Sequence, residues 1–360
     1  MEQFMRSSSL WQFVGRAIWP SASMLIAGLM AMLSLMPHAQ DAAQDIQSAI
    51  EKANLYIDIA EYTEHAVDSW DRYLGWVNVK TGPTGKERYI SDGMYPIDDL
   101  SGFLEAARRG AALEPSTPDL DSTITRYLDA YEALFPVMNR ANDYYERELY
   151  RTDAMTEGRA LHAQMVPLVA AFLTEREAML RELRPFVREV ERQEMTAMEE
   201  REGRSLAWQT AQVMHAANQV VDLFPQTRPT PIDPDTFEQM LDGIGPNTSG
   251  EEFDEIISGV AKPVDVVVDL ALFDPAVEEY AEAVDLFERF AAETPEEIED
   301  FKDLPRQFLS SLLVLQESLA RSQGRDFDGS GQQVGQVAQI YFSMVSASSG
   351  LSRSGLQFLN

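Results

Sequence analysis

Residues 117–149, TPDLDSTITRYLDAYEALFPVMNRANDYYEREL, decide the fold class of this chain. Thr117 followed by Pro118 is typical of a helix N-terminus, because the first helical turn does not need the N–H that proline lacks. Apolar side chains then recur every three or four residues, which is the period of one face of an α-helix. They are Ile124, Tyr127, Leu128, Tyr131, Leu134, Phe135, Met138, Ala141, Tyr145 and Leu149. The stretch therefore predicts one long amphipathic helix.

The same period continues on both sides of this stretch. Three prolines lie inside the apolar patterns, so we expect kinks rather than helix ends at Pro136, Pro167 and Pro185. Gly203 is a candidate break between two helices. Beside the helix from Pro118, the predicted helices are 42–77, 97–112, 156–224, 250–272, 274–292, 295–321 and 332–349.

One stretch, Val264–Val268 (VDVVV), has the composition of a strand, but its helical surroundings favour a buried helix. We therefore expect an all-α fold. It consists of an elongated helical bundle with long kinked helices over 42–224, and a second, more acidic helical segment over 237–350. The proline-rich stretch 225–236 (PQTRPTPIDPDT) is the candidate linker between them, and residues 351–360 form a tail.

The N-terminal residues 1–39 differ from the rest of the chain. Arg6 and Arg16 precede the apolar run 17–36, and Ala39 follows as a small residue at which cleavage is expected. This order is typical of a secretory signal peptide, so we expect an exported protein that is soluble in the periplasm or outside the cell. The alternative is an uncleaved anchor, because about 20 apolar residues can span a bilayer.

Charge and composition exclude several classes of function. Acidic residues outnumber basic ones 59 to 29, which gives a formal net charge of −30. A protein of this sign repels nucleic acid and anionic membranes, so neither is an expected partner. The absence of cysteine excludes disulfides, thiolate nucleophiles and metal sites with cysteine ligands. No G-x-S-x-G motif occurs, and carboxylate pairs are uninformative in so acidic a chain, so we expect no enzyme activity.

A series of short motifs runs through the chain in a fixed order: Tyr56–Asp58, Asp71–Leu74, Gly82–Glu87, Tyr127–Leu134, Asn142–Glu146, Leu149–Asp153, Gly158–His162, Glu200–Arg204 and, more loosely, Tyr341–Ser348. This series resembles the YiiG-like family of bacterial cell-envelope proteins, whose function is unknown. The resemblance covers about half the chain well and implies an all-helical envelope protein without implying an activity. Lipoprotein members carry a cysteine for lipid attachment, and this chain has none, so a lipid anchor is not implied.

A partial calcium loop is the one candidate metal site. Asp326, Asp328 and Ser330 stand at the first three ligand positions of an EF-hand loop, and Gly331 occupies the turn position. The position that needs a bidentate glutamate holds Val337. The stretch is therefore either an ordinary Asp/Gly turn or a weak Ca²⁺ site, and no other cofactor is expected.

The loop Gly82–Glu87 is a candidate recognition element. Its two glycines are too close together for a phosphate-binding loop, and Glu87 stands where that motif needs Ser or Thr. Lys86 and Arg88 are rare basic residues in an acidic chain, so the loop is either a surface for a partner or an ordinary connection between helices.

Tyrosines at helical spacing form a second candidate site. Tyr131, Tyr144 and Tyr145 could line a ligand groove, although such residues more often pack in a core with the hydroxyl at its rim. His162 lies beside the apolar stripe, where a buried hydrogen-bonded histidine is favoured over a metal ligand.

Together these observations predict an exported, non-enzymatic envelope protein that binds an envelope protein or a small ligand through a helical surface. The alternative is a periplasmic protein that binds a metal or small molecule, through residues 326–331 or through a tyrosine-lined cleft. Membrane contact is expected only through the N-terminal segment, if that segment is not cleaved.

Overall fold

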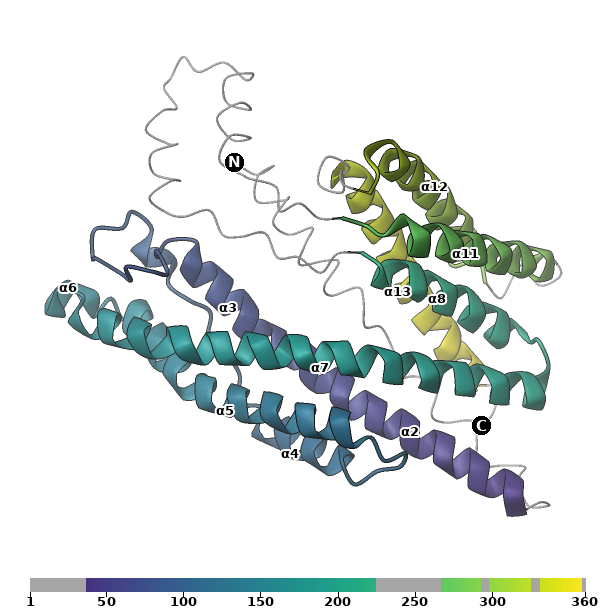
Figure 1. Ribbon diagram of the computed structural model, residues 1–360, viewed down its shortest axis with the longest axis horizontal. Helices are drawn as coiled ribbons and strands as arrows, with labels where there is room; N and C mark the ends of the chain where they lie inside the picture. The colour runs from purple at the N-terminus through teal and green to yellow at the C-terminus, as the bar shows by residue number, and fades with distance from the viewer. Residues whose placement is uncertain (1–36, 225–266, 293–297, 325–330, 358–360) are drawn as a thin grey trace. The chain divides into compact units, whose positions relative to one another are not determined.

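The computed structural model describes residues 37–224, 267–292, 298–324 and 331–357, and every regular element in these ranges is a helix (Figure 1). The all-α prediction is therefore confirmed for the described part of the chain. No helix among the described residues is both long and apolar enough to cross a membrane. Residues 1–36 and 225–266, which hold the apolar N-terminal run and the candidate linker, lie outside the described ranges.

The contacts divide the chain into two units. One, here called the α5 unit, comprises residues 51–187 within the described ranges. Its elements are α2 (Pro37–Tyr62, from residue 51 onward), α3 (Glu64–Leu74), the 3-10 helix η3 (Ile90–Asp92), α4 (Ser101–Gly110), α5 (Pro118–Glu146), α6 (Tyr150–Asp153) and α7 (Thr156–Glu202, up to residue 187).

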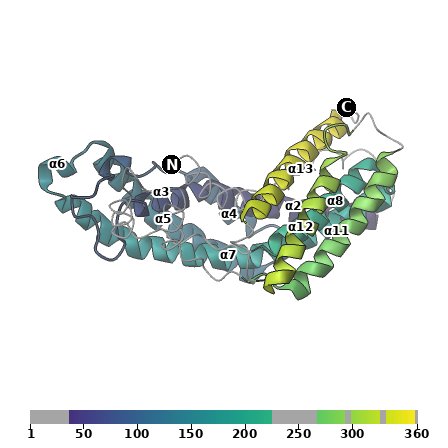
Figure 2. The ribbon, with the colours of Figure 1, turned by 90° about the horizontal axis from the view of Figure 1, so that it is seen from above.

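The other, here called the α8 unit, contains α8 (Leu206–Asp222), α11 (Leu270–Ala291), α12 (Leu304–Ser322) and α13 (Gly331–Gln357), together with the remaining parts of α2 and α7. Contacts join α8 to α11, α11 to α12, α12 to α13 and α13 back to α8, so these helices close into a four-helix bundle (Figure 2). Large apolar side chains fill its interior, among them Val213, Val220, Phe273, Phe287, Phe308, Leu312 and Leu315.

The interior of the α5 unit is richer in aromatic hydroxyl groups. The rings of Tyr127 and Phe172 stack with centroids 5.5 Å apart, which joins α5 to α7. Tyr56, Tyr73, Tyr127 and Tyr131 are fully buried, and each hydroxyl has a hydrogen-bond partner.

Several predicted helix boundaries are confirmed. Pro118 begins α5 at the first helical positions, and α7 begins at Thr156. Helices α5 and α7 continue through their prolines, as expected. Gly203 separates α7 from α8 and has a φ of +68°, a left-handed value that glycine adopts without steric strain.

The predicted single helix over 42–77 is wrong. It is interrupted at Thr63, whose hydroxyl donates to the Ile59 carbonyl (2.7 Å) and contacts the Tyr127 hydroxyl. The Ala66 N–H bonds to the Thr63 carbonyl three residues back, instead of four. A buried threonine that bonds across to α5 thus replaces part of the regular helical ladder.

The C-terminal boundaries also differ from the prediction. The described part of VDVVV is not helical, because the Val268 N–H bonds to the Gly324 carbonyl (2.9 Å) and joins this segment to the end of α12. Helix α11 therefore begins at Leu270, with the Asp269 carboxylate accepting from the Ala271 N–H, and it contains Pro275 instead of starting near it. Helix α12 begins at Leu304 and α13 reaches Gln357, inside the predicted tail.

Helix α8 packs with the C-terminal helices, whereas the sequence placed it in the N-terminal bundle. Its apolar face is covered by α11 and α13, and this pairing of distant segments leaves no local signal in the chain. The linker over 225–236 stays a prediction.

Candidate functional site

The connection between α3 and α4 folds into an ordered loop, residues 75–100, on the α5 unit. The Trp76 indole donates to the Gly93 carbonyl (2.8 Å), which ties the start of this loop to its middle. His162 of α7 bonds through Nε2 to the Val79 carbonyl (3.1 Å). A carbonyl can only accept, so Nε2 carries the proton, and Nδ1 accepts from the Tyr73 hydroxyl (3.0 Å). His162 therefore links the loop, α3 and α7.

His162 is held in the neutral form. Its burial lowers its pKa, against the smaller raising effect of the hydrogen bond to Val79. Gly82 packs on the imidazole ring: its φ is +71°, and a Cβ there would lie 2.8 Å from the ring carbon Cδ2. Both the backbone conformation and the contact therefore require glycine at position 82.

At the tip of the loop, the backbone binds a carboxylate of the loop itself. The Glu87 carboxylate accepts from the N–H groups of Thr84 and Gly85, the latter at 2.8 Å. Burial acts to raise the pKa of Glu87, but these hydrogen bonds outweigh it and lower the pKa. The N–H groups of Thr84 and Gly85 are therefore already bound by Glu87 and are not available to an external anion.

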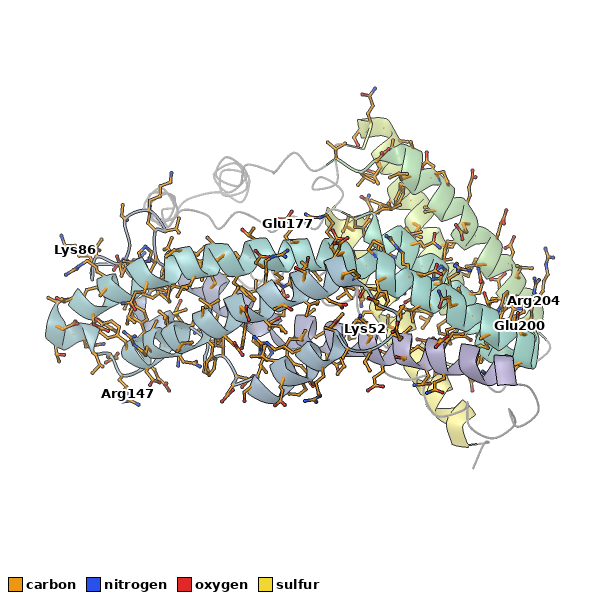
Figure 3. The ribbon with its side chains drawn as sticks, turned by 60° about the horizontal axis from the view of Figure 1, so that its bottom comes forward. Lys52, Lys86, Arg147, Glu177, Glu200 and Arg204 are labelled. Atoms are coloured by element: carbon orange, nitrogen blue, oxygen red, sulfur yellow. The ribbon has the colours of Figure 1, made fainter. Side chains whose placement is uncertain are left out.

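The basic side chains of the loop face solvent. Lys80, Lys86 and Arg88 are exposed, and Figure 3 shows Lys86 pointing away from the helices. Within the described residues none of the three forms an ion pair, whereas other surface arginines do, such as Arg108 with Asp129 (2.6 Å). The candidate recognition loop of the sequence is thus a braced loop with three exposed cations that have no ion-pair partner in the described part of the chain.

The predicted tyrosines lie inside the core. Tyr131, Tyr144 and Tyr145 are buried, as is His162. The Tyr131 hydroxyl donates to the Asp98 carbonyl (3.0 Å) and that of Tyr144 to the Asp153 carboxylate (2.8 Å). Their burial favours the packing interpretation over an open groove.

Tyr145 contacts the ring of Trp76 in the loop and the ring of Tyr144 on α5. Its ring centroid lies 5.0 Å from those of Trp76 and Tyr144. A Cβ added to Gly158 would lie 3.1 Å from the Tyr145 hydroxyl and 2.5 Å from the Met155 sulfur, so α7 approaches α5 closely only because residue 158 is glycine.

Most motifs that carry the family resemblance meet around this loop. The contacts described above join Asp71–Leu74, Gly82–Glu87, Asn142–Glu146 and Gly158–His162. Leu149–Asp153 adjoins them, because Asp153 accepts from Tyr144 and from the Glu157 N–H (2.9 Å) at the start of α7. Motifs spread along the sequence therefore form one region of the α5 unit.

Sequence reasoning missed a buried ion pair. Lys52 is fully buried, and its ammonium lies 2.9 Å from the Asp121 carboxylate. It also donates to the carbonyls of Leu113 (3.3 Å) and Pro115 (3.0 Å). The Tyr56 hydroxyl donates to the same carboxylate (2.6 Å). The signal available was a lysine four residues before Tyr56, beside the apolar stripe of α2.

The partial calcium loop lies outside the described residues. Asp326, Asp328 and Ser330 fall in the range 325–330, so their role stays a prediction. In the part of the chain that is described, no three His, Asp or Glu side chains gather closely enough to hold a metal ion.

The fold and this region define an all-helical protein with a braced basic loop on an otherwise acidic chain. The family model called "Protein of unknown function (DUF3829)" matches residues 47–304, so the chain belongs to that family. It is 30% identical over 182 residues to "Uncharacterized protein YiiG" of Escherichia coli (strain K12). That match covers 49% of this chain and 52% of the relative, so the chain spans about half the length of YiiG. No solved structure matches. The resemblance read from the motifs is confirmed.

Proposed function

We propose that this protein is an exported, non-enzymatic protein of the cell envelope that binds an acidic protein partner through the loop 78–93. The observation that carries the proposal is that Lys80, Lys86 and Arg88 on that loop are exposed and form no ion pair with any residue that the structure describes, in a chain of net charge −30.

Three carboxylates of the α5 unit are bound by groups other than these cations. Glu87 accepts from the loop backbone, Asp153 from the first turn of α7, and Glu148 pairs with Arg151 (2.8 Å). With Lys80, Lys86 and Arg88 against Glu87 and Asp92, the loop 78–93 keeps a net charge of +1. This charge attracts an acidic segment over a Debye length of about 8 Å at physiological salt.

The bracing of the loop favours binding. Its shape is fixed by the Trp76–Gly93 bond, the His162–Val79 bond and the Glu87 carboxylate. A loop that is already ordered loses little conformational entropy when a partner binds. Tyr73 and His162, which lie next to the loop, are buried and bonded to each other, so neither is presented to a substrate, which favours a binding role over an enzymatic one.

The test is site-specific crosslinking in cells. A photo-reactive amino acid replaces Ser91, whose side chain is exposed on the same loop. We expect an adduct with an envelope protein, and we expect its loss when Lys80, Lys86 and Arg88 are all changed to Glu. The matched control changes Arg109, Arg181 and Arg321 to Glu, since these are exposed cations elsewhere and the change in charge is the same. Equal loss in both triple variants would mean that only net charge matters and would contradict the proposal.

A further inference from the structure

A second surface of the α5 unit carries exposed aromatic rings. Tyr62 is 44% exposed, Phe103 42% and Tyr95 47%. All three lie where the segment 95–103 runs along the end of α2 and along α3. We propose that this strip binds an uncharged carbohydrate chain.

Three contacts define the strip. The Ser69 hydroxyl donates to the Tyr95 carbonyl (2.7 Å), the His65 Nδ1 lies 3.4 Å from an Asp98 carboxylate oxygen, and Tyr62 meets Phe103. As the helix residue number falls, that of its partner rises, so the segment runs antiparallel to the helices. From Tyr62 to Arg72 the helical rise is about 15 Å. The strip is therefore long enough for a short oligosaccharide.

Contacts with neighbouring side chains hold the three rings in place. The centroids of Tyr62 and Phe103 are 4.1 Å apart, with planes tilted by 41°. The Arg72 guanidinium lies 4.3 Å from the Tyr95 ring centroid and donates to the Asp92 carbonyl (2.5 Å). Rings fixed in this way do not have to be ordered by a ligand, and the three residues keep 42–47% of their surface exposed.

The chemistry of the strip fits a sugar. Aromatic faces carry partial negative charge, which attracts the C–H groups on the face of a pyranose ring. Between the aromatic ends lie His65 and Asp98, both exposed, which can exchange hydrogen bonds with hydroxyl groups. Asp99 is also exposed, and one of its oxygens bonds to the Ser101 N–H (3.0 Å).

The net charge of the protein limits which ligands can bind to these exposed aromatic rings. A net charge of −30 repels polyanions such as nucleic acids and anionic lipid surfaces, and it also opposes association with a second copy of this chain. An uncharged polymer is not repelled. Within the strip, Asp98 and Asp99 are exposed carboxylates that disfavour an anionic group, and the Arg72 guanidinium is already placed against the Tyr95 ring and the Asp92 carbonyl.

The test is titration of the full chain with uncharged tetrasaccharides, one of glucose and one of N-acetylglucosamine, followed by saturation-transfer NMR and calorimetry. We expect saturable binding to at least one of them, with a Kd that rises at least tenfold in the double variant Tyr62→Ala/Phe103→Ala. The control, Leu149→Ala/Leu313→Ala, removes exposed apolar side chains elsewhere and should leave the Kd unchanged. Circular dichroism verifies that each variant keeps its helix content.

The dependence of binding on ionic strength distinguishes this surface from the basic loop. Binding of an uncharged sugar should be the same at low and high ionic strength, and it should survive the Lys80/Lys86/Arg88 change to Glu. No binding of either tetrasaccharide, or binding equal in the aromatic variant and the wild-type chain, would overturn the inference. So would a preference for an acidic polysaccharide such as polygalacturonate over both neutral probes.

Discussion

The two units bury different kinds of side chain. The α8 unit packs Phe, Val and Leu side chains around α8, α11, α12 and α13. Among its described residues, the buried polar side chains are Gln209, Thr210, Ser311 and Ser348, all uncharged. The α5 unit buries a charged pair, Lys52 with Asp121, and a histidine, His162, bonded to a tyrosine. An apolar interior tolerates exchange among side chains of similar volume, whereas a buried polar network requires every partner. The difference indicates that the interior of the α5 unit tolerates fewer substitutions than the interior of the α8 unit.

The largest expected effect comes from removing the buried cation. Lys52→Met leaves the Asp121 carboxylate without its ion pair and two carbonyls without a donor, so unfolding free energy should fall by about 3–5 kcal/mol. Urea unfolding followed by circular dichroism measures this. Arg109→Met, which breaks an exposed pair with Glu105, should cost no more than about 1 kcal/mol. Equal effects of the two changes would remove the contrast between buried and surface charge.

A cavity in the α8 unit should cost somewhat less on average. Leu312 is fully buried, so Leu312→Ala should lower the unfolding free energy by about 2–5 kcal/mol, whereas Leu312→Met should cost less than about 1.5 kcal/mol. The tolerance of Met at an apolar site is the opposite of what Lys52→Met should show. If Leu312→Met lowered the unfolding free energy as much as Lys52→Met, the two interiors would not differ in their tolerance of substitution.

Two glycines of the α5 unit should respond in opposite directions. Gly82→Ala places a Cβ against His162 at a left-handed φ, and we expect a loss of about 1–2 kcal/mol. Gly102 lies inside α4 with open space at the Cβ position, so Gly102→Ala should gain about 0.5–1 kcal/mol. Thermal melts of the two variants at one pH make the comparison. A neutral Gly82→Ala would mean that the loop does not depend on its contact with the imidazole.

The smallest effect should be a pH dependence that belongs to the α5 unit. Burial lowers the pKa of His162 below its ordinary 6.5, so the unfolded chain takes up this proton at a higher pH than the folded chain. The stability contributed by the neutral ring is complete above about pH 6.5 and is lost as the pH falls through the folded pKa. The melting temperature should therefore drop less between pH 7.5 and 5.5 in His162→Gln than in the wild-type chain. An identical drop would assign the pH dependence to other groups.

The sequence predicted much of the fold because helical period and helix ends are local. Pro118, Gly203 and the uninterrupted apolar pattern through Pro167 specify α5, the α7–α8 break and the long α7 from neighbouring residues alone. The break at Thr63 was not predictable in this way, because it depends on a hydrogen bond to Tyr127 on another helix.

The same limit applied to the site. Lys86 and Arg88 could be chosen as surface residues because basic side chains are rare in this chain. That Glu87 would turn inward and leave them free depends on the folded loop. The strip of Tyr62, Tyr95 and Phe103 had no sequence signal, since exposure of a ring is decided by what packs beside it.

The sequence by itself determined the all-α class, the family and the acidic character, since these follow from composition, short-range periodicity and ordered motifs. Only the tertiary structure decided which helices share a core, where Lys52 finds its counter-charge, and which cations and rings remain at the surface. These are pairings between residues far apart in the chain. Their free energy depends on burial and geometry that no single stretch contains.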